Sequence, residues 1–392
     1  MKSLWNDTLA QACQNDLALR VYTSRLLGQN DALVLHGGGN TSVKITKESE
    51  PLLYVKGSGW DLVSIEEEGF APVRLSTLQE MATRKHLSDT QMVSEQKKAM
   101  TNPKAPNPSV EAILHALIPF TFVDHTHADA VVTLSNSQEG EQLIAECFKD
   151  FLIVPYVMPG FILAQTIYEM TQNFDWEKCK GIILHHHGIF TFDNDAQRSY
   201  EKMIEAVTQA EKMLDAKAPL RVTEAKEQRA YEITELKQAI EALKGHEVVM
   251  KINRSPLART YASQKNLKAF ASRGVLTPEH IIRTKRVPLI LEEECIEEAL
   301  HAYVADYKAY FKRYAKEETM LNPAPNYAVI KDFGVLLFGK SEKETTILND
   351  IVEHTMRAVL RADKLGGYQS IGEKESFEME YWELEQAKLK RS

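Results

Sequence analysis

Cysteine is scarce in this chain. Its 392 residues include four cysteines, and no two of them have the CxxC spacing of a thiolate metal site. Scattered cysteines also argue against the dense disulfide framework of small secreted domains. The cysteine content favours a reducing compartment, and we expect the protein to be cytoplasmic.

Long apolar segments are missing as well. The first residues, MKSLWNDTLAQACQ, lack the apolar core of a signal peptide. No run approaches the roughly 20 apolar residues that cross a bilayer. We therefore expect neither secretion nor membrane insertion.

Basic charge is not in excess. The formal net charge is -8, with 47 basic and 55 acidic residues, and no arginine-rich run occurs. This balance gives no reason to expect nucleic acid as a partner. The hydrophobic content of 44% and charged content of 26% are those of globular proteins. A chain of 392 residues predicts two domains.

The hydrophobic pattern predicts mixed α and β structure. Residues 4–28 have the spacing of an amphipathic helix, and the short runs FTFVDHTH, AVVTL and LIVPYVM are β-rich. Ala218-Pro219 interrupts a long helical pattern, which indicates a domain boundary. We therefore expect a catalytic domain over residues 1–220, a connecting helix over 221–245 and a second, smaller α/β domain over 246–392.

The second domain contains a short echo of the first. YAVIKDFGVLLF at 327–338 aligns without gaps on GIILHHHGIFTF at 181–192, so that Gly334 matches Gly188 and Phe333 stands where the first copy has His187. This match indicates a duplicated unit, although a chance match of short apolar runs is about equally good as an explanation. If the duplication is real, the second copy lacks a histidine.

Three histidines are candidates for metal ligands. His125 and His127 alternate on an expected strand, so their side chains project from the same face. His187 would sit at a strand end beside Gly188. Three imidazoles with one open position are typical of a catalytic zinc site. The alternative is that all three are ordinary polar residues, and we place four other histidines outside the ligand set: His36, His115, His185 and His186.

Glu111 and two glycine-rich segments could complete such a site. Glu111 lies in an expected first helical turn, where it could be a mere partner of the helix dipole or an acid/base beside a metal. Residues 37–42, GGGNTS, and 56–59, KGSG, offer amides and hydroxyls that suit a phosphate, or simply make turns. Neither matches a Walker P-loop or GxGxxG, so nucleotide binding is not indicated.

In their order along the chain, the segments GGNTSVK, VKGSG, PSVE, HTH and HHG resemble the class II aldolase/adducin superfamily. The match covers roughly residues 10–215. The whole chain is similar to the aldolase portion of bifunctional rhamnulose-1-phosphate aldolase/alcohol dehydrogenases, including VKGSGWDL and EYWELE. The resemblance implies an α/β/α sandwich around a mainly antiparallel sheet, in a homo-oligomer that could be a tetramer.

The resemblance also implies roles for individual residues. His125, His127 and His187 would bind Zn²⁺ or another divalent metal, and Glu111 would be the acid/base. The family's usual Ser-Ser-Glu reads Ser109-Val110-Glu111 here, so one hydroxyl that helps the phosphate is lost. The residues implied to bind substrate phosphate are Asn40, Thr41, Ser42, Ser58, Gly59 and Ser109. The family's tyrosine proton donor has no numbered counterpart that we can assign.

The implied activity is cleavage of a ketose 1-phosphate, similar to rhamnulose 1-phosphate, into dihydroxyacetone phosphate and an aldehyde. A metal-dependent sugar-phosphate dehydratase, decarboxylase or epimerase of the same superfamily is the alternative. Glu111 disfavours the epimerases, which carry aspartate there. A non-catalytic adducin-like interaction protein is a weaker alternative, since adducin-type domains lack the three histidines.

Overall fold

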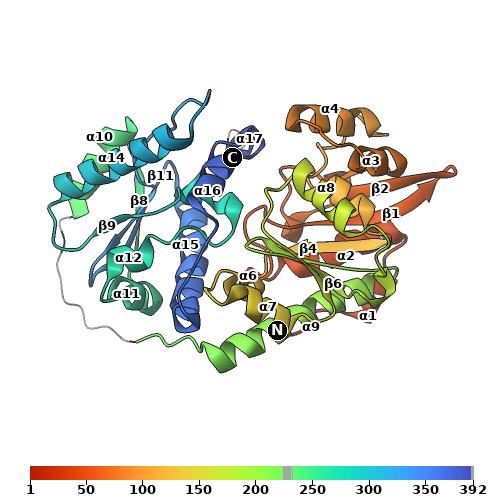
Figure 1. The fold of residues 1–392 in the computed structure, drawn as a ribbon, viewed down its shortest axis with the longest axis horizontal. Coiled ribbons are helices and arrows are strands. Elements are labelled where there is room, and N and C mark those ends of the chain that lie inside the picture. The colour runs from red at the N-terminus through yellow and green to blue at the C-terminus, as the bar shows by residue number, and fades with distance from the viewer. Residues whose placement is uncertain (224–230, 232, 390–392) are drawn as a thin grey trace. The chain divides into compact units, whose positions relative to one another are not determined.

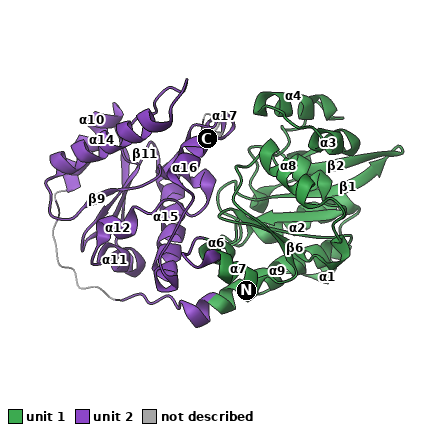
Figure 2. Cartoon of the chain, in the orientation of Figure 1, with its two compact units in different colours: residues 1–135, 141–213, 391 green, residues 136–140, 214–390, 392 purple. Residues whose placement is uncertain are grey.

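The computed structural model describes residues 1–223, 231 and 233–389 (Figure 1). Part of the expected connecting helix, residues 224–230 and 232, lies outside the described residues. The chain divides into two compact units (Figure 2). The first comprises residues 1–135 and 141–213, and the second comprises 136–140 and the described residues from 214 onward.

The first unit is built on a seven-stranded sheet with the order β3-β2-β1-β4-β7-β6-β5. Every neighbouring pair is antiparallel except β5 and β6, which are parallel. The sheet is thus mainly antiparallel, as expected, but mixed. Its strands are β1 (Asn40–Lys47), β2 (Glu50–Lys56), β3 (Phe70–Arg74), β4 (Phe122–Thr126), β5 (Phe151–Val154), β6 (Gly181–Leu184) and β7 (Gly188–Asp193).

Helices cover both faces of this sheet. Leu114 of α5 and Leu163 of α8 join the core on one face, and Leu17 of α2 and Ala196 of α9 pack on the other. This is the expected α/β/α sandwich. The helices of the unit are α1 (Asp7–Gln11), α2 (Asp16–Gly28), α3 (Leu75–Ala82), α4 (Asp89–Ala99), α5 (Ala112–Leu117), α6 (Asp129–Ser135), α7 (Gly140–Cys147), α8 (Phe161–Met170) and α9 (Ala196–Lys217).

Two local expectations were wrong. Residues 4–28 form two helices, because the side chains of Asn6 and Asn15 each accept a backbone N–H and so cap a new helix. The run AVVTL belongs to helix α6 instead of a strand. All of its residues are buried, and a short run buried on every side carries no periodicity that distinguishes helix from strand.

The central strand β4 is held by a buried ion pair. The Arg20 guanidinium of α2 donates to the Asp124 carboxylate, which also accepts the Ser199 hydroxyl of α9, and both charged side chains have zero exposure. Successive side chains alternate across a strand, so Asp124 and His125 face opposite sides of the sheet. The ion pair therefore holds β4 from one face of the sheet, and His125 lies on the opposite face, toward α5.

The second unit has a four-stranded sheet with the order β8-β11-β10-β9. Leu236 of α10 and Leu300 of α14 pack on one face of it, while α15 contacts β8 and β11. Its strands are β8 (Val249–Asn253), β9 (Leu289–Leu291), β10 (Tyr327–Ile330) and β11 (Gly334–Gly339). Its helices are α10 (Ile233–Lys244), α11 (Pro256–Ala262), α12 (Leu267–Ala271), α13 (Ile281–Thr284), α14 (Ile296–Tyr314), α15 (Glu342–Ala362), α16 (Glu373–Glu380) and α17 (Glu383–Leu389).

Both sheets contain the same four-strand topology. The order β5-β6-β7-β4 in the first unit corresponds to β9-β10-β11-β8 in the second, with parallel and antiparallel pairings at the same places. The hairpin turns match too, since His186 and Asp332 occupy equivalent turn positions with φ of 58° and 56°. A long helix, α9 or α15, follows each hairpin. Topology thus adds support to the duplication suggested by the sequence.

No helix among the described residues has both the length and the apolar character needed to cross a bilayer.

Candidate active site

Three histidine side chains converge on one face of the first unit's sheet. His125 lies in β4, His127 directly follows that strand, and His187 ends the turn between β6 and β7. One ligand nitrogen from each ring can be chosen so that all three atoms lie within 4.8 Å of one another. His125 and His187 are buried, whereas His127 is partly exposed.

The hydrogen bonding of His125 suits a metal ligand. Its Nδ1 lies 3.1 Å from the carbonyl oxygen of Ile189, so Nδ1 carries the proton and Nε2 keeps its lone pair. This Nε2 is 3.0 Å from Nε2 of His127. A carbonyl that orients the far nitrogen of a ligating imidazole is common at metal sites. The donor set therefore fits a divalent ion such as Zn²⁺.

Gly188 permits this convergence. A Cβ atom at this position would lie 2.4 Å from the Thr126 carbonyl oxygen and 3.1–3.2 Å from ring carbons of His125 and His127. Any side chain here would push the hairpin away from β4. The glycine next to His187 is therefore required by the close approach of the hairpin to the Thr126 carbonyl of β4.

Gly188→Ala is expected to cost about 1–3 kcal/mol of folding free energy, as overpacking does, and to weaken zinc binding. Gly334→Ala is a control in the second unit, where no histidines converge among the described residues: its Cβ would meet the Asn253 carbonyl oxygen at 2.5 Å, and its φ of 146° adds backbone strain of its own. Denaturant unfolding and zinc titration separate the two effects. Equal zinc affinities in the two variants would contradict the assigned role.

Glu111 lies beside the histidines. It occupies the cap position just before α5, one residue earlier than the expected first turn. Its carboxylate is 5% exposed, with Oε2 3.5 Å from His125 Nε2 and Oε1 3.8 Å from His187 Nε2. Oε1 is buried and accepts no hydrogen bond. A buried carboxylate oxygen without a donor, next to imidazole nitrogens, is what a bound cation or a transferable proton would satisfy.

Asn40 holds this carboxylate. Its Nδ2 donates to Glu111 Oε2 at 2.7 Å and to the Ser109 hydroxyl at 3.2 Å, and β1 pairs Asn40 directly with His125. On the far side, Asn40 Oδ1 accepts from His115 Nε2. Asn40 therefore connects the glycine-rich segment 37–42 to Glu111, the acid/base candidate. The sequence did not predict this connection.

The next two residues point elsewhere. The Thr41 hydroxyl is bonded to Ser24 at 2.8 Å and the Ser42 hydroxyl to His115 Nδ1 at 2.8 Å, and both side chains have zero exposure. The structure thus does not present either hydroxyl as a free donor beside the candidate ligands His125, His127 and His187. Strand alternation sends Thr41 to the opposite face of the sheet from Asn40.

Lys44 also has a structural role. Its ammonium donates to the carbonyl oxygens of His115, Ile118 and Phe120 at 3.0, 2.7 and 2.7 Å. These carbonyls lie at the C-terminal end of α5, where a cation is favourable. Burial lowers the pKa of Lys44 to about 7. Lys44 therefore anchors the helix that follows Glu111 and does not extend toward the site.

The second glycine segment lies against the Ser109 loop. The Ser109 amide donates to the Lys56 carbonyl at 3.1 Å, and the Ser58 amide donates to the Asn107 carbonyl at 2.8 Å. Gly59 is exposed with a φ of 92°, and nothing lies within 4 Å of where its Cβ would be. These bonds bring the loop of Ser58 and Gly59 next to that of Ser109, whose hydroxyl accepts from Asn40.

His185 and His186 belong to the turn that carries His187. Burial lowers the pKa of both rings, to about 4 for His186, so they are neutral near pH 7. The Tyr156 ring lies 6.3 Å from that of His186. Neither histidine joins the group of ligand atoms.

The second unit has different residues at the equivalent positions. Thr126 pairs with Ile189, and Asn253 pairs with Val335 in the same register, so Ile252, Arg254 and Phe333 stand in the places of His125, His127 and His187. The Arg254 guanidinium lies over the Phe333 ring, 4.6 Å from its centroid. A cation–π pair thus replaces two imidazoles, and no metal-binding group of histidines, cysteines or acids occurs in the described part of this unit.

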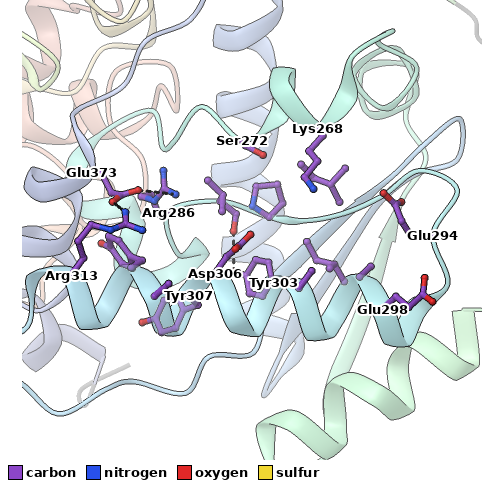
Figure 3. A pocket seen from close by; sticks show the side chains of 18 residues that line it. Lys268, Ser272, Arg286, Glu294, Glu298, Tyr303, Asp306, Tyr307, Arg313 and Glu373 are labelled. Carbon is purple, nitrogen blue, oxygen red and sulfur yellow. Dashed lines mark hydrogen bonds and ion pairs between the residues drawn. The ribbon is translucent and has the colours of Figure 1, made fainter.

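A cavity of about 490 Å³ lies in the second unit between α14, β9 and the end of α12 (Figure 3). The guanidinium groups of Arg286 and Arg313 at one end are both paired with Glu373. Tyr303 donates to the Val287 carbonyl in the middle. The cavity contains none of the histidines or glycine-segment residues of the candidate site.

Comparisons with known proteins identify two family domains in the chain. The family model for the Class II Aldolase and Adducin N-terminal domain matches residues 18–214, and that for Aldolase class II, second domain, matches 227–389. A Bacillus subtilis (strain 168) protein named "Uncharacterized oxidoreductase YuxG" is 26% identical over 419 residues. That match covers 99% of this chain but 60% of the relative, so the chain spans only part of its length.

Solved structures are similar as well. The N-terminal class II aldolase domain of a conserved protein from Thermoplasma acidophilum is 36% identical with a TM-score of 0.50, covering 55% of this chain and 99% of that one. L-fuculose-1-phosphate aldolase from Thermus thermophilus is 16% identical with a TM-score of 0.33, covering 50% and 95%. With its N-terminal domain matched over residues 18–214 and its second domain over 227–389, the chain belongs to the class II aldolase and adducin family.

Proposed function

We propose that this protein is a zinc-dependent class II aldolase that cleaves a ketose 1-phosphate into dihydroxyacetone phosphate and an aldehyde. One observation carries the proposal: the Glu111 carboxylate lies 3.5–3.8 Å from Nε2 of His125 and His187, with one oxygen that accepts no hydrogen bond. The candidate proton carrier and the candidate cation ligands are thus adjacent.

His125, His127 and His187 would hold the ion. Three neutral imidazoles and an open fourth position are the arrangement of catalytic zinc. When bound there, the ion supplies Lewis-acid stabilisation of the negative charge that develops on the sugar oxygens as the carbon–carbon bond breaks. No lysine Schiff base is needed in this proposal.

Glu111 acts as the acid/base. In the cleavage direction the C3–C4 bond breaks, the C4 hydroxyl loses its proton as it becomes the aldehyde oxygen, and Glu111 gives a proton to C3 of the three-carbon fragment; in the synthetic direction Glu111 removes that proton from C3. The hydrogen bond from Asn40 Nδ2 orients the carboxylate, and burial excludes competing water. These features suit a group that must reach one carbon atom with a defined geometry.

The substrate phosphate is proposed to bind at the two glycine segments. Backbone bonds join the loops that carry Ser58 and Ser109, Asn40 donates to the Ser109 hydroxyl, and Gly59 is exposed, which supports this proposal. Thr41 and Ser42 support this part of the site from within, because their hydroxyls are already bonded. Val110 in place of a second serine leaves the phosphate with fewer hydroxyl donors than the family pattern provides.

A two-part experiment tests the proposal. Metal analysis of the purified protein is expected to give about one zinc ion per chain, since the histidine group offers one site, and a screen of ketose 1-phosphates is expected to release dihydroxyacetone phosphate with at least one of them. Zinc with loss of water or carbon dioxide instead would favour the dehydratase or decarboxylase alternative. Neither metal nor turnover would favour an adducin-like interaction protein. Sedimentation of the same sample tests the proposed homo-oligomer.

A further inference from the structure

A chain of buried hydrogen bonds leads from the interior of the first unit to Glu111. It passes from the Ser42 hydroxyl to His115 Nδ1, from His115 Nε2 to Asn40 Oδ1, and from Asn40 Nδ2 to Glu111 Oε2. Ser42 and His115 have zero exposure, and Asn40 and Glu111 are 7% and 5% exposed. Bulk water therefore does not compete for these bonds.

The bond to Glu111 determines which atom donates and which accepts in the other two hydrogen bonds. A carboxylate accepts, so the Asn40 amide must present Nδ2 to Glu111 and Oδ1 to His115. His115 must then carry its proton on Nε2, which leaves Nδ1 as the acceptor for the Ser42 hydroxyl. If Asn40 turned over, its carbonyl oxygen would face the carboxylate.

His115 is itself firmly held. Its backbone amide donates to the Glu111 carbonyl at 3.1 Å, and its carbonyl accepts from the Lys44 ammonium at 3.0 Å. Its ring lies edge-on to Phe190, with centroids 5.3 Å apart. Burial holds the pKa of His115 well below its usual range. The ring therefore has one position and one tautomer available.

We infer that His115 is a positioning residue, which locks the Asn40 amide so that its N–H holds Glu111 Oε2 and leaves Oε1 directed at the histidine cluster. The inference rests on the proposed acid/base role of Glu111. His115 touches neither substrate nor metal in this arrangement. Its effect should therefore fall on turnover and leave substrate binding and zinc content nearly unchanged.

The test compares His115→Phe with His115→Gln in zinc-loaded protein. Phenylalanine keeps a planar ring without a donor, whereas glutamine restores an N–H that can reach Asn40. We expect His115→Phe to lower kcat by about 10–100-fold, the range for residues that orient an active group, with KM and zinc unchanged. His115→Gln is expected to recover most of the turnover. His86→Gln, on an exposed histidine of the same unit, is the control and should match wild type.

A readout without substrate separates this inference from the proposed function. Long-range ¹H–¹⁵N spectra of wild-type protein are expected to show the His115 ring neutral and protonated on Nε2. A wild-type protein that cleaves no ketose phosphate would refute the aldolase proposal. The His115 tautomer would still test the hydrogen bonds from Ser42 through His115 and Asn40 to Glu111. The inference is overturned by a proton on Nδ1, by a raised KM with normal kcat in His115→Phe, or by equal turnover in the two variants.

Discussion

His187→Ala is expected to abolish zinc binding, and turnover with it. His187 supplies one of only three imidazoles in the group, and its loss leaves His125 and His127 as a two-ligand site. Substitution of residues that merely orient a ligand already costs about 10–100-fold in metal affinity. Removal of a ligand should cost more. The measurements are zinc content after dialysis and the zinc dissociation constant.

Two controls make this result specific. His185→Ala removes a buried neighbour in the same turn that is not in the ligand group, so it should retain the ion. His86→Ala removes an exposed histidine of the same unit and should behave as wild type. Full zinc occupancy in His187→Ala would show that the third ligand is assigned wrongly. Equal losses in His187→Ala and His185→Ala would point to a distorted turn.

Glu111→Gln is expected to lose turnover while keeping the fold and the ion. The amide has nearly the same shape, and its oxygen can still accept from Asn40 Nδ2, but it cannot carry the proton. General acid–base groups contribute about 10²–10⁴-fold to rate, so kcat should fall by a factor in that range. Steady-state kinetics, zinc content and thermal unfolding are measured on one preparation.

A second glutamate of the same unit gives the control. Glu146→Gln changes an exposed carboxylate on α7 and should leave kcat unchanged. Near-normal turnover in Glu111→Gln would leave Glu111 as a partner of the α5 helix dipole and nothing more. A loss of zinc together with turnover would make it a ligand.

The sequence predicted the histidine cluster because its signals are local. The spacing of His125 and His127 alone places both side chains on one strand face. His187 is followed by Gly188, and the contact that a Cβ atom would make there explains the glycine. That His187 joins His125 and His127 was implied by the family resemblance, and the strand order β5-β6-β7-β4 that brings the two segments together is seen in the structure. Spacing cannot specify which strands pair when they lie far apart in the chain.

The hydrogen bonds that surround Glu111 could not be predicted from the sequence. Strand alternation could have separated Thr41 from Asn40 and Ser42, since period two puts it on the other face. Nothing local indicates that Asn40 binds Glu111 on one side and His115 on the other. Such bonds join residues 71 and 75 positions apart, and the assembled fold alone shows them.

The second unit illustrates what a repeat preserves. Gly334 keeps the close contact of Gly188 with the neighbouring strand, while Arg254 and Phe333 occupy the places of two ligands. The second unit thus keeps the close packing of the hairpin but lacks the histidine side chains that would bind a metal. We therefore expect zinc to bind in the first unit and not in the second.

The most direct test of the account is hydrogen exchange at C3 of dihydroxyacetone phosphate in D₂O without any aldehyde. In the proposed function an ion at the three histidines would acidify this position and Glu111 would remove and return its proton, so zinc-loaded wild-type protein should incorporate deuterium at C3. Zinc-loaded Glu111→Gln should incorporate it at least about 100-fold more slowly. Absence of exchange in wild-type protein that holds zinc, or undiminished exchange in Glu111→Gln, would contradict the account.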